Sequence, residues 1–225
     1  MRNCYWLLAA FCFWPAHVTQ AATIAFDFDT GLPVLAHGQS LPLDQTKGGV
    51  TAQFRFTAGF DGFSVQSDGS TGFTLSQFSG HYLNSNGLNP GPLYIGFSQL
   101  LTSFSFTFAT ADFHQVEATT TILLTAYLDS TGTAPVGSAT AHGTYGADTM
   151  PMGALAFTSG LSFNLVEIKI LPGQPLGATA FLVDNIQVTA VPAATTGVPE
   201  PTGYALVGIG LLALALRFRR VRAAA

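Results

Sequence analysis

The sequence predicts an all-β fold, an antiparallel β-sandwich of jelly-roll type with a cleaved N-terminal signal helix and a single C-terminal transmembrane helix. Three observations carry this prediction. Apolar and polar residues alternate with period two along the middle of the chain. Gly- and Pro-containing turn clusters separate these runs at intervals too short for crossover helices. An apolar segment lies near each end. The expected organisation is a signal peptide (1–21), a sandwich (22–190), a linker (191–198) and a tail (199–225).

The N-terminal segment has the features of an export signal. It begins with Met and Arg, continues with an apolar stretch from Cys4 to Trp14, and reaches small residues at Thr19 and Ala21. We expect cleavage after Ala21 or Ala22. A buried N-terminal helix is the alternative, but the apolar run is short and ends in a proline. Both cysteines of the chain lie in this segment, so the mature protein would contain no disulfide.

Three runs alternate strictly and predict half-buried strands. In "TIAFDFD", Ile24, Phe26 and Phe28 share one face, and Asp27 and Asp29 share the other. The runs "VTAQFRFT" and "SFSFTF" alternate in the same way, with Phe on the buried face. The 19 Phe residues are therefore expected to be mainly core.

Later segments are less regular. "TILLTAYL" is apolar enough to pack on both faces. "LSFNLVEIKI" changes phase, because Phe163 and Leu165 have one parity while Val166 and Ile168 have the other. "FLVDNIQVT" also changes phase. A change of phase inside a strand predicts a β-bulge.

The tail follows a linker of small residues and prolines, "AVPAATTGVPEP". Residues 203–216 carry no charge, and four arginines follow: Arg217, Arg219, Arg220 and Arg222. With flanking residues, the run reaches the lower limit of about 17 residues for a membrane span. The arginines would act as a basic stop-transfer signal on the cytoplasmic side, and the body would lie outside.

The order of features in the tail is specific. Val198, Pro199, Glu200 and Pro201 precede the apolar run, and "RFRR" follows it near the end of the chain. This arrangement resembles the PEP-CTERM sorting signal of exported proteins in Gram-negative bacteria. The resemblance implies that an exosortase recognises the motif while the tail lies in the inner membrane. It further implies that the enzyme processes the chain nearby, and that the body reaches the cell surface or the exopolysaccharide matrix.

The charge of the body excludes nucleic acid as a partner. From Ala22 to Val198 there are three Lys and Arg residues against eleven carboxylates, a net charge of −8. Nucleic-acid binding needs a patch of cations that neutralises phosphates, and three scattered cations do not supply one.

No catalytic motif stands out in the body. The histidines His37, His81, His114 and His142 are scattered and lack the spacing of metal ligands, so no metal site is predicted from them. Motifs of nucleophilic hydrolases and nucleotide-binding loops are absent from the sequence. A glycosidase needs two carboxylates across the sugar bond, and Asp27 with Asp29, or Glu167 with Asp184, are the candidate pairs. A solvated face explains these acids more simply.

One strand suggests a structural ion. "FLVDNIQVT" resembles the closing strand of calcium-stabilised, carbohydrate-binding-type jelly rolls. If the terminal strands pair, Asp184 would meet Asp27 or Asp29 and, with carbonyl oxygens, hold one Ca²⁺. In the alternative, which the sequence favours, Asp184 and Asn185 form a bulge by bonding to nearby backbone.

These observations predict an exported, non-enzymatic β-sandwich with a structural or adhesive role and no cofactor, a structural calcium ion being the one alternative left open. A carbohydrate-binding module for exopolysaccharide is the alternative, and a glycoside hydrolase is the third reading. Exposed aromatic residues in a row on one sheet would favour the carbohydrate-binding module, and two convergent acids in a cleft would favour the glycoside hydrolase. A sheet faced only by Ser and Thr would favour the structural or adhesive role.

Overall fold

A computed structural model describes residues 21–70, 72–87, 89–112, 120–172, 180–192 and 208–211. The chain divides into two units, Met1–Val191 and Pro192–Ala225. In the second unit the described residues are Pro192 and a short helical turn at 208–211. The described part of the chain contains no helix with the length and apolar character of a membrane span. The expected signal segment before Ala21, the transmembrane segment apart from this turn, the motif from Val198 to Pro201 and the four arginines lie outside the described residues.

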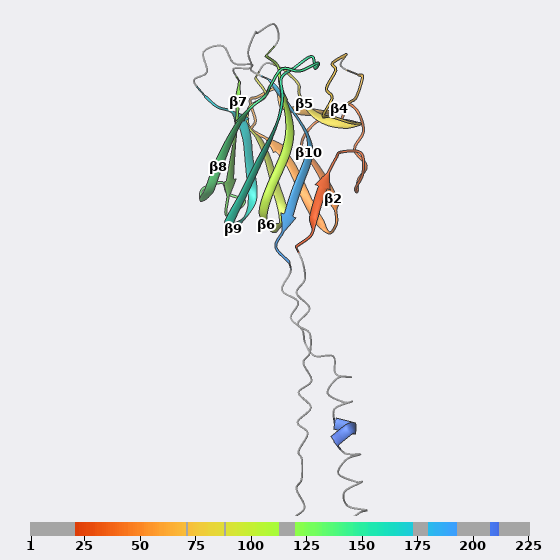
Figure 1. The fold of residues 1–225 in the computed structure, drawn as a ribbon, viewed down its shortest axis with the longest axis vertical. Coiled ribbons are helices and arrows are strands. Elements are labelled where there is room, and N and C mark those ends of the chain that lie inside the picture. Colours follow the sequence, from red (N-terminus) through yellow and green to blue (C-terminus); the bar gives the residue numbers. More distant parts are fainter. Residues whose placement is uncertain are drawn as a thin grey trace, which may run out of the picture. The chain divides into compact units, whose positions relative to one another are not determined.

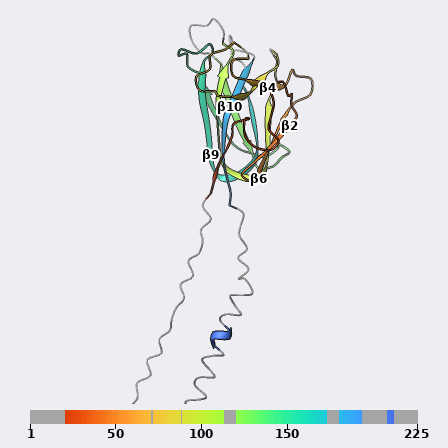
Figure 2. The same cartoon turned by 90° about the vertical axis from the view of Figure 1, so that its right-hand side faces the viewer.

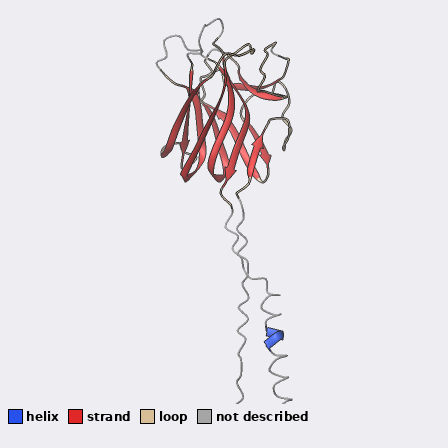
Figure 3. Cartoon of the chain, in the orientation of Figure 1, coloured by secondary structure: helices blue, strands red, loops and turns tan. Residues whose placement is uncertain are grey.

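Ten strands form the first unit (Figure 1). In chain order they are β1 (Thr23–Phe26), β2 (Leu43–Lys47), β3 (Val50–Phe56), β4 (Phe63–Ser67), β5 (His81–Ser85), β6 (Leu93–Thr110), β7 (Thr121–Tyr127), β8 (Pro135–His142), β9 (Met152–Ile170) and β10 (Phe181–Ala190). Figure 3 shows that strands dominate this unit, which we call the body, residues 22–192. Every strand pair is antiparallel, so the all-β, antiparallel expectation is confirmed, whereas the jelly-roll connectivity stays a prediction.

Two long strands, β6 and β9, join the halves of the sheet. The hydrogen-bonded order is β4-β5-β10-β6-β9-β7-β8, with β1 on β10 and β3 between β2 and β6. β3 pairs with the first part of β6, at residues 93–97, and β10 pairs with the last part, at residues 101–110. Figures 1 and 2 show β6 and β9 running along the body, with the other strands arranged around them. A single sheet therefore supplies both layers of the fold.

The core lies between these layers and contains the Phe residues that alternate along the strands. Phe54 of β3 and Phe106 of β6 are buried in the same cluster as Phe181 of β10. Along β6 the ring of Phe106 lies 5.7 Å from that of Phe104 and 6.0 Å from that of Phe108. Burying each such side chain contributes about 1.5–3 kcal/mol. All strands and the whole cluster lie inside the first unit, so the body has the core it needs to fold without the residues that follow it.

Irregular pairing is found at one predicted change of phase and beside the other. In β9 the pairing with β6 is regular at Leu165 and Val166, where the parity changes, and the register shifts on either side of the pair Leu101 and Phe163. In β10 the register with β6 shifts between Asp184 and Gln187, and Asn185 has a φ of 51°. Asn tolerates this left-handed conformation better than most residues. The bulge expected at Asp184 and Asn185 is therefore present.

Two expectations for strands need correction. "TIAFDFD" does not run as one strand to Asp29: β1 ends at Phe26, because Asp27 accepts hydrogen bonds from the backbone and hydroxyl of Thr30 and closes a turn. "TILLTAYL" does not pack fully on both faces. Ile122 and Leu124 are in the core, but Leu123, Thr125 and Tyr127 are only half-buried.

Candidate functional site

The first and last strands pair, as the calcium hypothesis required. Thr23 of β1 lies opposite Thr189 of β10, and Phe26 lies opposite Ile186. This pairing brings Asp27 and Asp29, which follow β1, into the neighbourhood of Asp184, and both charges act on that carboxyl group. The strand pairing that the hypothesis required is therefore present, and these acids are close enough for their charges to interact.

Asp27, Asp29 and Asp184, which we call the acidic cluster, each already have partners. Lys47 Nζ lies 2.9 Å from Asp27 Oδ2, and His81 Nδ1 lies 2.6 Å from Asp29 Oδ1. Asp184 is fully buried and accepts hydrogen bonds from the backbone N–H groups of Ser79 (3.1 Å) and Asn185 (2.7 Å). Within the described ranges, no three His, Cys, Asp or Glu side chains are grouped so that they could hold a metal ion. Carbonyl oxygens would have to complete a calcium site, and the ion stays a prediction.

Burial governs the titration of Asp184. Burial, helped by the negative charges of Asp29 and Asp27, raises the pKa of this carboxyl to about 7, while the backbone hydrogen bonds oppose the shift. Asp27 behaves differently: burial opposes ionisation, but hydrogen bonds from Lys47 and Thr30 outweigh it and lower the pKa. Near neutral pH a proton on Asp184 therefore relieves repulsion inside the cluster.

A second constellation lies on the outer face of the half-sheet formed by β3, the start of β6, the end of β9 and β7. Its side chains alternate with core residues of the same strands and come together across the sheet. We call it the polar face, and it consists of Gln53, Arg55, Tyr94, Tyr127, Glu167 and Lys169.

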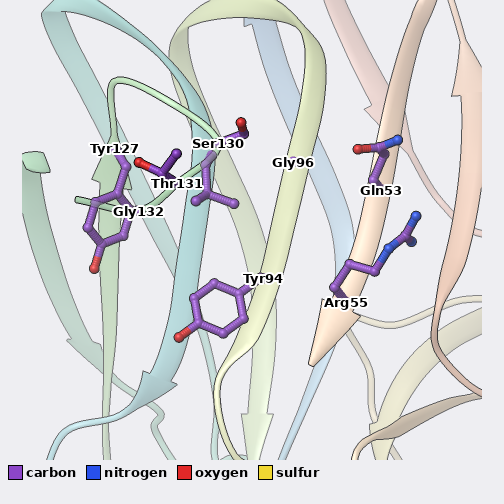
Figure 4. A pocket seen from close by; sticks show the side chains of 9 residues that line it. Gln53, Arg55, Tyr94, Gly96, Tyr127, Ser130, Thr131 and Gly132 are labelled. Atoms are coloured by element: carbon purple, nitrogen blue, oxygen red, sulfur yellow. The ribbon is translucent and has the colours of Figure 1, made fainter. Parts of the chain in front are cut away.

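Strand register explains why these residues meet. In one row across the sheet, Arg55 lies opposite Tyr94, which lies opposite Glu167. In the next row, Gln53 lies opposite Gly96, and Leu165 lies between Gly96 and Tyr127. Since Gly96 has no side chain, the second row is hollowed at its centre. Figure 4 shows Tyr94 in the middle, with Tyr127 on one side and Arg55 and Gln53 on the other.

Glu167 is the centre of a hydrogen-bond network beneath this face. Its side chain is 7% exposed and accepts hydrogen bonds from the hydroxyls of Tyr94 (3.2 Å) and Tyr127 (2.9 Å). Lys169 Nζ lies 3.0 Å from both carboxylate oxygens. Burial and the Glu167 carboxylate raise the pKa of Tyr94, and burial with the hydrogen bond to Glu167 raises the pKa of Tyr127 to about 12. Both phenols therefore stay protonated at neutral pH and are held by one carboxylate.

The hollow above this network has a volume of about 370 Å³. Besides residues of the polar face, the loop after β7 lines it with Ser130, Thr131 and Gly132. The lining thus combines two aromatic rings with amide, hydroxyl and guanidinium groups. Because the phenol protons point to Glu167, the phenol oxygens offer lone pairs to a ligand. Such a surface suits a ligand with both C–H faces and many hydroxyl groups.

The sequence-predicted acid pairs do not form a glycosidase site. Glu167 lies opposite Tyr94 near the start of β6, whereas Asp184 lies opposite Thr107 near its end, so the structure does not bring Glu167 and Asp184 together. Asp27 and Asp29 are held by Lys47 and His81. The described residues that line the hollow include no carboxylate.

Each histidine in the described residues has a partner of its own. His37 Nδ1 lies 3.3 Å from Ser67 Oγ, His81 pairs with Asp29, and His142 Nδ1 lies 2.9 Å from Thr121 Oγ1. His114 lies outside the described residues.

Sequence reasoning missed Tyr94, Tyr127 and Arg55. One signal was available, because Arg55 is the only arginine between Ala22 and Val198 and points outward in a strand that was predicted. The tyrosines gave no such signal. They lie 73 and 40 residues from the glutamate that joins them.

Comparison with known proteins identifies the tail. Residues 197–220 match the PEP-CTERM protein-sorting motif, as the sequence predicted. No curated protein matches the chain in sequence.

Three solved structures are similar to the body in fold. The K2 cleaved adhesin domain of Lys-gingipain is 16% identical, with a TM-score of 0.49, and the match covers 75% of this chain and 99% of that one. A DUF4465 family protein from Bacteroides caccae is 13% identical (TM-score 0.38; 80% and 97% covered). The CBM22-1 xylan-binding domain of Paenibacillus barcinonensis Xyn10C is 12% identical (TM-score 0.34; 77% and 97% covered). At these TM-scores the likenesses carry no argument about what this chain binds.

Proposed function

We propose that this chain, which carries a PEP-CTERM protein-sorting motif, is an exported, non-enzymatic protein of the cell surface or extracellular matrix that holds polysaccharide on the polar face of its body. Exosortase would be the partner that processes the tail. Of the two readings of the sequence, structural sandwich and carbohydrate-binding module, the second has the stronger support. The supporting observation is a pair of tyrosine rings fixed by one buried glutamate on an open sheet face.

The arrangement suits a sugar for two physical reasons. A pyranose presents C–H groups on its faces and hydroxyls at its rim, so it packs on aromatic rings and bonds to polar groups around them. Tyr94 and Tyr127 supply the rings, and Gln53 and Thr131 supply polar groups at the edge of the hollow. Because Glu167 holds both phenols, little side-chain freedom is lost when a ligand binds.

Affinity electrophoresis in gels that contain extracellular polysaccharide tests the binding function. The polysaccharide should slow the migration of the body through the gel. The double variant Tyr94→Ala with Tyr127→Ala should lose at least tenfold in affinity, which corresponds to about 1.4 kcal/mol of binding free energy from the ring contacts. Phe60→Ala is the matched control, because Phe60 is an exposed aromatic residue outside the polar face. Retardation of the double variant equal to that of the unmodified body would sink the proposal.

Gly96 allows a test that does not disturb the glutamate network. A Cβ at this position would meet only Gln53, at 3.6 Å or more, so Gly96→Val should fold normally. Its branched side chain would fill the floor of the hollow. We expect the Gly96→Val variant to be as stable as the unmodified body but to migrate without being slowed by the polysaccharide. If its migration is slowed as much as that of the unmodified body, this would count against a ligand in the hollow.

The sorting step has its own test. Prolines on both sides of Glu200 keep that segment out of a helix and favour an extended peptide, which is the conformation that transpeptidases bind. We expect Pro199→Ala with Pro201→Ala to leave export intact and to block processing. Intact mass of the protein, from cells with and without exosortase, measures the outcome. Normal trimming of the double variant would show that the prolines are not read.

A further inference from the structure

Building on the proposed function, we infer that the polar face selects neutral polysaccharides and rejects acidic ones. The reason is that the face contains cations but leaves none of them free for an anionic ligand. Each positive side chain is already neutralised by a carboxylate of the same sheet.

Arg55 is held by its own and the adjacent strand. Its Nη2 lies 2.6 Å from Asp44 Oδ1, and Nη1 donates hydrogen bonds to the carbonyls of Leu43 (2.9 Å) and Phe54 (2.8 Å). A uronate or sulfate group would have to compete with Asp44 for the fork of the guanidinium. A neutral sugar needs only the planar face of the guanidinium and its remaining N–H groups.

Lys169 is occupied in the same way. Both oxygens of Glu167 lie 3.0 Å from its Nζ, and the Glu167 side chain is almost fully buried. Removing Lys169 from this pair would leave a buried carboxylate without its counter-charge, which is strongly unfavourable. The lysine is therefore committed to the network beneath the tyrosines.

The rest of the body offers no alternative cation. Lys47 is the third and last Lys or Arg between Ala22 and Val198, and it pairs with Asp27 at 2.9 Å. All three cations lie in described residues, and all three are paired, while the body carries a net charge of −8. An acidic polymer that approaches the polar face meets net repulsion, whereas a neutral one meets none.

Asp44→Asn tests this inference at the position where the fold is least at risk. The Asp44 side chain is 48% exposed, and the substitution releases the guanidinium of Arg55. Asp68→Asn is the matched control, because it changes the net charge equally at an exposed turn after β4. The body and both variants are run through gels that contain neutral polysaccharides (dextran, mannan, xylan and a mixed-linkage glucan) or acidic ones (alginate and polygalacturonate). Each gel is run at low and at 0.5 M salt, roughly the range over which surface charges become screened.

We expect the unmodified body to be retarded by a neutral polysaccharide and not by either acidic one. Asp44→Asn should gain affinity for the acidic polymers by about fivefold, the value of one close charge pair in water, and should lose this gain at high salt. Asp68→Asn should behave like the unmodified body. Unmodified body that binds alginate or polygalacturonate as tightly as neutral polymers would overturn the inference but leave the proposed function standing. So would an Asp44→Asn variant with no gain. Failure to bind any polysaccharide would refute the proposed function, and the inference with it.

Discussion

Asp184→Asn should change how the stability of the body depends on pH. Burial, together with the charges of Asp29 and Asp27, raises the pKa of Asp184 from 3.8 to about 7. At 1.36 kcal/mol per unit this corresponds to about 4 kcal/mol. Between pH 4 and pH 7 the folded state holds a proton that the unfolded state has lost, so the free energy of unfolding falls as the pH rises through this window. Asparagine does not titrate and removes this slope.

Urea denaturation of the body (22–192), followed by circular dichroism at several pH values, measures the effect. Both tryptophans of the chain lie in the N-terminal segment, at residues 6 and 14, so the body has no tryptophan fluorescence to follow. Near pH 4 the variant and the unmodified body should be similar in stability. At pH 8 the variant should be more stable, by as much as about 4 kcal/mol. Buffers with chelator keep any bound ion from contributing.

The difference between the two proteins isolates Asp184, because the other titrating groups are common to both. Asp148→Asn is the control: Asp148 also accepts a backbone hydrogen bond, from Ser76, but it is only partly buried. It separates the effect of burial from that of removing a carboxylate. A stability difference between Asp184→Asn and the unmodified body that stays constant from pH 4 to pH 8 would refute the reasoning.

Three further predictions concern packing and the ion. Phe106→Ala should destabilise the body by about 3–5 kcal/mol, because Phe106 is buried between two other rings. Leu161→Ala, at a 66% exposed position, should cost less than about 0.5 kcal/mol, and urea denaturation compares the two variants. Gly153→Ala should cost about 1–3 kcal/mol in the same assay, since its Cβ would lie 2.6 Å from the Phe108 ring and 2.9 Å from a backbone oxygen. At Gly160 an added Cβ meets nothing within 4 Å, so Gly160→Ala should be tolerated. Equal losses of stability in the two variants would contradict the steric argument. If Asp184 and backbone carbonyls hold calcium, excess Ca²⁺ should raise the melting temperature of the body relative to chelator, and identical values would speak against the site.

Local sequence pattern was sufficient for much of the fold. The strict alternation of "VTAQFRFT" predicted β3, with Val50, Ala52 and Phe54 in the core as observed. The break of parity in "FLVDNIQVT" predicted the bulge at Asn185. Both features depend on side chains within a few residues of one another, which is the range over which period-two patterns carry information.

The lengths of β6 and β9 and the polar face were not predictable in this way. Gly96 and the polar residues after it interrupt the alternation of β6, so the sequence predicted only the part "SFSFTF" of a strand that has 18 residues. The polar face depends on the register between strands distant in the chain. Glu167 reads as an ordinary solvated acid until that register places it under Tyr94 and Tyr127.

The position of β10 in the sheet also determines when the body can become folded during export. This strand comes last in the body, yet it pairs with β1, β5 and β6 and supplies Phe181 and Val183 to the core. Until β10 is available, β1 lacks its partner and the core stays open, so the body cannot complete its fold. The strand that closes the core is thus also the one that directly precedes the linker and the residues that match the sorting motif.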